Sequence, residues 1–126
     1  MRVLFLAIDG VLCCNSEGLL EADKVRQLMR IASQTGVKVC LSSNWRLYDP
    51  LRSFLYERLA AVGIEVVGTT PDAGEAELDL CMRPHEICGW LKTWHRKGLP
   101  RIESFVAVDD CALLQELGGA ALRGAL

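Results

Sequence analysis

Residues 3–10 read VLFLAIDG, a run of six apolar residues that stops at an aspartate followed by a glycine. A short apolar run bounded by a turn residue is typical of a strand buried on both faces of a parallel sheet. A second run, SFVAV at 104–108, stops at a pair of aspartates. We therefore expect two strands of one parallel sheet, each ending in acidic residues.

Between these runs the pattern alternates between short apolar stretches and helical spacing. Strands are predicted at 3–8, 37–41, 64–67 and 104–108. Helices are predicted at 18–33, 50–62 and 84–97. Residues 68–82 have no clear period and predict a loop, and 111–117 predict a short helix or turn. This order predicts the α/β class, a three-layer sandwich in which helices cover both faces of an open parallel sheet.

Each predicted helix has one apolar face for packing on the sheet. The face of helix 18–33 consists of Leu19, Leu20, Val25, Leu28, Met29 and Ala32. The face of helix 50–62 consists of Leu51, Phe54, Leu55, Leu59 and Val62. The face of helix 84–97 consists of Ile87, Trp90, Leu91 and Trp94.

Length and composition limit the class of protein. A chain of 126 residues predicts a single domain over 1–126. A net charge of −2 gives no bulk attraction to nucleic acid or membranes, and no apolar run has the length of a signal sequence or a membrane span. Six cysteines without a CxxC pair argue against a zinc ribbon, and free thiols predict a reducing, cytoplasmic location.

Polar side chains follow three of the predicted strands, where ligands bind in open parallel sheets. They are Asp9, Gly10 and Asn15, then Ser42, Ser43, Asn44 and Arg46, then Asp109 and Asp110, with Arg83 just ahead of the third helix. Carboxylates suit a hard cation such as Mg²⁺, and hydroxyls and an arginine suit phosphate oxygens. Each group alone is also compatible with a turn or a helix cap. Their convergence on three strand ends favours a metal-assisted phosphate site.

These residues resemble the four motifs of the haloacid dehalogenase (HAD) phosphohydrolases. LFLAIDGVL at 4–12 resembles motif I, a strand that usually runs into Asp-x-Asp-Gly. Ser42 stands at the motif II hydroxyl, and Arg83 where motif III usually has a lysine. FVAVDD at 105–110 resembles motif IV, a strand ending in an acidic pair.

The resemblance implies hydrolysis of a phosphate monoester through an aspartyl-phosphate. It assigns the nucleophile position to Ala7 and the general acid and base to Asp9. The family's magnesium is held by the nucleophile and by groups that correspond here to Asp9, Asp109 and Asp110. The phosphate-binding residues implied are Ser42, Ser43 and Arg83. Arg83 is equally compatible with a surface position whose stem packs on the helix.

Ala7 is the principal departure from the family pattern. A methyl group neither attacks phosphorus nor binds Mg²⁺, so we expect little or no turnover. Two explanations remain open: a natural pseudo-enzyme that binds phosphorylated ligands or protein partners, or an introduced Asp→Ala change. The intact Asp9, Ser42, Asp109 and Asp110 lean slightly towards the second.

The segment LSSNWR at 41–46, with EICGWL at 86–91, is similar to a small capless HAD group associated in part with RNA-repair proteins. No insertion is long enough for a large cap, so an open site would admit a phosphorylated nucleic-acid end or a phosphoprotein. The chain stops soon after motif IV, which is compatible with a truncated C-terminus. A structural subunit that dimerises through its tail and third helix is a weaker alternative.

Three aromatic or basic residues outside the motifs carry expectations of their own. His85 and His95 are ten residues apart and are expected at the surface rather than as a metal pair. Trp45 follows motif II and either lines the site or packs in the core, the more frequent role of tryptophan.

Overall fold

The structure is a computed structural model that describes residues 1–72, 82–111 and 113. Its sheet contains the parallel strands β1 (Arg2–Leu6), β2 (Lys38–Leu41), β3 (Val66–Thr69) and β4 (Ser104–Val108), in the order β3-β2-β1-β4. The helices are α1 (Ala22–Thr35), the 3₁₀ turn η1 (Asn44–Leu47), α2 (Asp49–Ala61) and α3 (Arg83–Arg96).

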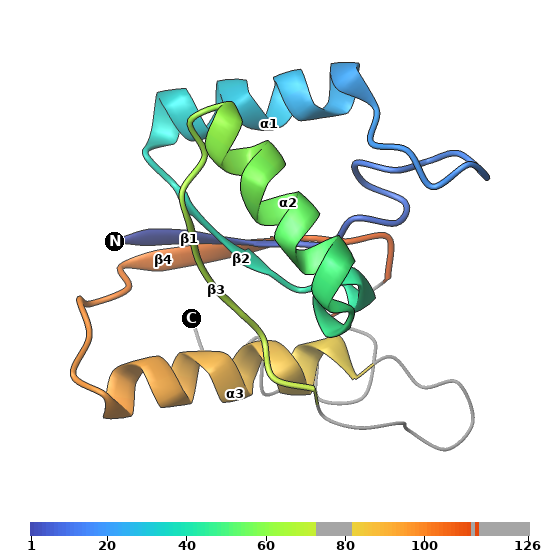
Figure 1. The fold of residues 1–126 in the computed structure, drawn as a ribbon. Coiled ribbons are helices and arrows are strands. Elements are labelled where there is room, and N and C mark those ends of the chain that lie inside the picture. The colour runs from blue at the N-terminus through green and yellow to red at the C-terminus, as the bar shows by residue number, and fades with distance from the viewer. Residues whose placement is uncertain (73–81, 112, 114–126) are drawn as a thin grey trace.

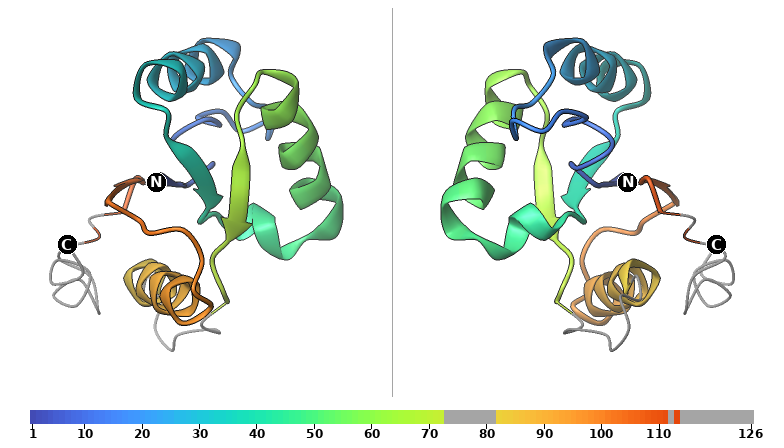
Figure 2. Two further views of the ribbon diagram at one scale, coloured as in Figure 1. Left: turned by 90° about the vertical axis from the view of Figure 1, so that its left-hand side faces the viewer. Right: turned by 90° about the vertical axis from the view of Figure 1, so that its right-hand side faces the viewer.

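The elements form three layers, with α1 and α2 on one face of the sheet and α3 on the other (Figure 1). The end-on views of Figure 2 show the same separation of α3 from α1 and α2. The predicted α/β sandwich with a parallel sheet is therefore confirmed, and no cap domain interrupts the described part of the chain. None of its helices is long and apolar enough to cross a membrane.

The central strand β1 explains why its sequence is continuously apolar. It pairs with β2 on one side and β4 on the other, and residues 3–8 are at most 1% exposed. Because successive side chains of a strand point to opposite faces, Leu4 and Leu6 pack towards α1 and α2. Val3 and Phe5 pack towards α3, where the ring of Phe5 meets Trp90 edge to face.

Two predicted boundaries at the start of the chain were wrong because local hydrogen bonds compete with the regular elements. The strand ends at Leu6 rather than at residue 8, since the Ile8 carbonyl accepts the N–H groups of the following turn. The first helix begins at Ala22 rather than at residue 18. The Asn15 side chain accepts the N–H groups of Glu17 and Leu19 and so holds a polar turn ahead of the helix.

Two further predictions were wrong at α2 and β3. The strand starts at Val66, not at residue 64, because the Ile64 N–H donates to the Leu59 carbonyl and closes the end of α2. Of the predicted apolar face of this helix, Leu55 and Leu59 are fully buried, whereas Leu51 and Phe54 are 38% and 41% exposed. The core therefore meets only a narrow stripe of α2. The predicted turn at 111–117 lies mostly outside the described residues.

The cysteines give a first testable prediction. Cys40 lies in β2 at 0% exposure, and burial raises the pKa of its thiol to about 12, although the nearby Arg46 charge lowers it. Since the thiolate is the reactive form, we expect Cys40 to resist alkylation by iodoacetamide in the native protein. The exposed Cys14 is expected to react readily, as measured by peptide mass spectrometry. Labelling of both at equal rates before unfolding would contradict the buried position of Cys40.

Candidate functional site

The carboxyl ends of three neighbouring strands meet at one edge of the sheet. Leu6 of β1 is in register with Leu41 of β2 and Val108 of β4. The Ala7 N–H donates to the Val108 carbonyl at 3.0 Å, and the Ser42 N–H donates to the Leu6 carbonyl at 2.9 Å. Ala7, Ser42 and the residue after Val108 therefore stand side by side at this edge.

The two serines after β2 have different surroundings. Ser42 is 1% exposed, and its Oγ has no hydrogen-bond partner among the residues described. Ser43 is equally buried, but its Oγ accepts the Trp45 N–H at 3.2 Å and caps η1. A buried hydroxyl without a partner costs about 1–3 kcal/mol and calls for an explanation such as a ligand. Ser42 is thus the stronger candidate for ligand binding.

The acidic pair after β4 lies against the start of α3. Arg83, the first residue of α3, forms an ion pair with the buried carboxylate of Asp109, which also accepts the Cys111 N–H at 2.9 Å. The Asp110 carboxylate is 3.7 Å from the same guanidinium. Of the two positions open to Arg83 from the sequence, the structure places it beside these acids, with its side chain 14% exposed.

The turn after β1 touches the same acids. Gly10 has a positive φ of 78°, and a Cβ at this position would lie 2.4 Å from an Asp110 carboxylate oxygen. Only glycine allows so close an approach in this backbone conformation. The carboxylate oxygens of Asp109 and Asp110 and the Sγ of Cys111 lie within 4.8 Å of one another.

Asp9 is exposed, and a contact with Trp45 fixes the direction of its side chain. Its Oδ1 accepts the indole N–H of Trp45 at 3.1 Å. Trp45 itself is 9% exposed and belongs to the core cluster under α1 and α2. Both roles expected of Trp45 are therefore combined, because its ring packs in the core while its edge faces the site. His85 and His95 are exposed, as predicted.

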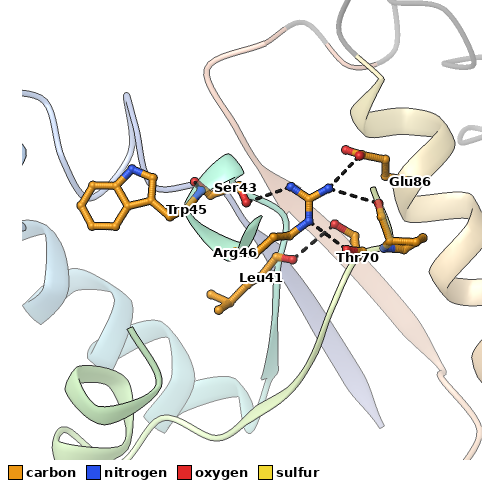
Figure 3. Close-up of polar contacts among 7 residues, drawn as sticks. Leu41, Ser43, Trp45, Arg46, Thr70 and Glu86 are labelled. Carbon is orange, nitrogen blue, oxygen red and sulfur yellow. Dashed lines mark hydrogen bonds and ion pairs between the residues drawn. The ribbon is translucent and has the colours of Figure 1, made fainter. Parts of the chain in front are cut away.

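Arg46 is placed differently from the other polar residues at the strand ends. It is 2% exposed and points into the protein, towards α3 and the segment after β3 (Figure 3). Its guanidinium donates to the Ser43, Thr70 and Pro71 carbonyls and to the Glu86 carboxylate. Sequence reasoning missed Glu86. The available signal was a charged residue directly before Ile87, which belongs to the apolar face of the predicted helix.

These observations define the class of the protein: an α/β domain whose sheet presents acids, an arginine and a hydroxyl without a partner among the described residues at its carboxyl edge. Residues 3–124 match the family model described as the HAD domain in Swiss Army Knife RNA repair proteins, and the chain belongs to this family. The predicted resemblance to a small HAD domain is thereby confirmed. Neither a curated protein nor a solved structure was found to be similar to the chain.

Proposed function

We propose that this chain is a Mg²⁺-dependent phosphomonoester hydrolase scaffold that acts through an aspartyl-phosphate in its parent form, and that Ala7 at the nucleophile position disables hydrolysis but leaves the phosphate-binding residues in place. The observation that carries the proposal is the Oγ of Ser42, which is buried and without a partner among the described residues, one strand away from Ala7. A phosphoryl oxygen would accept a hydrogen bond from this hydroxyl and so supply the missing partner.

The other residues of the edge have roles that their contacts support. With an aspartate at position 7 attacking phosphorus, the Asp9 carboxyl gives a proton to the leaving oxygen and later takes one from the hydrolytic water. The Trp45 N–H holds Asp9 in one direction for both steps. Arg83, beside Asp109, brings a positive charge to the edge where the phosphoryl oxygens gather.

The acids fit the magnesium ion that the family implies. Asp109 and Asp110 bring two carboxylates together, and Arg83 contacts both as a single positive charge. The family pattern adds the backbone carbonyl of Asp9 as a further ligand. A divalent cation would offset the remaining negative charge, and carboxylate and carbonyl oxygens are its preferred ligands. Bound there, Mg²⁺ would neutralise charge on the phosphoryl group. Ala7 provides one carboxylate fewer than the family pattern, so we expect weaker metal binding than with aspartate.

Titration with inorganic phosphate in the presence of Mg²⁺ tests the proposal. We expect the chain to bind phosphate and Ser42→Ala to weaken binding about tenfold, because one hydrogen bond to a charged group is lost. Ser53→Ala, at an exposed position of α2, is the matched control and should bind as the unchanged chain does. Equal affinities of the Ser42→Ala and Ser53→Ala variants would remove Ser42 from the phosphate site.

A second candidate function is a non-catalytic one, in which the same edge binds a phosphorylated partner without turnover. Ala7 itself favours it, since the rest of the site is retained. The description of the family favours the phosphorylated end of a nucleic acid over a phosphoprotein. A 5′-phosphorylated oligoribonucleotide is then expected to bind more tightly than inorganic phosphate, and its unphosphorylated form to bind weakly.

A further inference from the structure

One buried ion pair joins three separate segments at the carboxyl edge of the sheet. Arg46 and Glu86 are both buried charged residues. The distance from Arg46 Nη2 to Glu86 Oε2 is 2.7 Å, and their side chains are 2% and 7% exposed. These residues are forty positions apart in the sequence, so the ion pair is a long-range contact.

The guanidinium reaches beyond Glu86 to backbone groups of two loops. Its Nη1 donates to the Ser43 carbonyl at 2.9 Å, which fixes the peptide between Ser43 and Asn44, one residue beyond Ser42. Its Nε donates to the Thr70 carbonyl at 2.8 Å, and its Nη2 to the Pro71 carbonyl at 3.1 Å. Figure 3 shows this fan of contacts between η1, the end of β3 and the first turn of α3.

Ser42 and Arg83, which are proposed to bind phosphate, lie close in sequence to the residues that this ion pair connects. Ser42 directly precedes the bonded Ser43, and Arg83 opens the helix that carries Glu86 in its first turn. A shift of α3 relative to η1 would therefore change the separation of the Ser42 hydroxyl from the Arg83 guanidinium. Three N–H groups of Arg46 donate to carbonyls and one donates to Glu86. We therefore do not assign Arg46 a direct contact with phosphate.

We propose that Arg46 and Glu86 are positioning residues, a buried clamp that sets the distance between Ser42 and Arg83 and so the affinity of the site for phosphate. The inference rests on the proposed function for the ligand that is positioned. A planar guanidinium with four directed bonds fixes orientation in a way that apolar contacts do not. Buried ion pairs add little stability compared with apolar residues of equal volume, which is compatible with a role in geometry.

The test measures the affinity for inorganic phosphate, with Mg²⁺ present, in two conservative variants kept below their melting temperatures. Glu86→Gln retains a hydrogen-bond acceptor for Arg46 and removes the charge. Arg46→Lys retains the charge and removes the fork. Glu65→Gln is the matched control, since it makes the same change in an exposed ion pair. Its partner, Lys38, is the first residue of β2 and lies at the end of the strand away from the site.

We expect each clamp variant to bind phosphate about tenfold more weakly or worse, as when groups that support binding residues are altered, and Glu65→Gln to bind normally. Circular dichroism on the same samples establishes that the protein is folded. A folded clamp variant with unchanged affinity would overturn the positioning role and leave the proposed function intact. Absence of phosphate binding in the unchanged chain would overturn both.

Discussion

The Ala7→Asp variant is expected to hydrolyse an aryl phosphate in the presence of Mg²⁺, at a rate about three orders of magnitude or more above that of the unchanged chain. The gain is large because a covalent nucleophile and a metal ligand are restored together. The position is suitable, since the Ala7 backbone is held between Val108 and the β2 edge, directly beside Ser42. Release of the aryl alcohol at saturating substrate is the measurement.

An aspartate at position 7 also has a cost that can be measured. Ala7 is 0% exposed, so an added carboxylate loses much of its hydration. We expect the melting temperature of Ala7→Asp to fall below that of the unchanged chain without Mg²⁺ and to recover when Mg²⁺ is added. A ligand that binds only the folded state raises its stability in this way.

The control for this experiment is Ala7→Asn, which has the shape of aspartate but no nucleophilic charge. We expect it to remain inactive. Asp9→Asn, added to Ala7→Asp, should lower the rate about 10²–10⁴-fold, because it removes the general acid and base. If Ala7→Asp remained inactive while inorganic phosphate still bound, the catalytic part of the proposal would be wrong. The non-catalytic binding role would then stand.

The sheet could be predicted from sequence because its strands are short, apolar and bounded by turn residues. β4 was predicted at its observed limits, and β1 within two residues. The errors occurred where a side chain or carbonyl near an element competes for its hydrogen bonds, as Asn15 does ahead of α1. Such local competition does not change the spacing of apolar residues in the sequence. The boundaries of helices and strands are therefore less predictable than their existence.

The candidate site divides along the same line. Ala7, Ser42 and Asp109 could be brought together from sequence, since the ends of parallel strands share one edge. Their partners could not. The bond from Trp45 to Asp9 spans 36 positions and that from Arg46 to Glu86 spans forty, and both depend on how η1 packs. Arg46 follows a strand end, a position at which ligand-binding residues are expected, but its side chain points towards α3.

Replacing Arg46 with methionine is expected to lower the free energy of unfolding by about 3–5 kcal/mol, the usual cost of leaving one charge of a buried pair alone. Glu86 would remain with 6% of its surface exposed. The carbonyls of Ser43, Thr70 and Pro71 would lose a donor at the same time. Urea unfolding followed by tryptophan fluorescence measures the change, with Trp45 next to the altered residue.

The double variant Arg46→Met with Glu86→Met separates the charge from the carbonyls. Removing both charges relieves the isolated carboxylate, so part of the lost stability should return. The three carbonyls stay without their donor, and we therefore expect the double variant to remain less stable than the unchanged chain. Arg52→Met, in an exposed ion pair with Asp49, should cost less than about 1 kcal/mol. A loss for Arg46→Met no greater than that for Arg52→Met would show that the buried network does not hold these segments together.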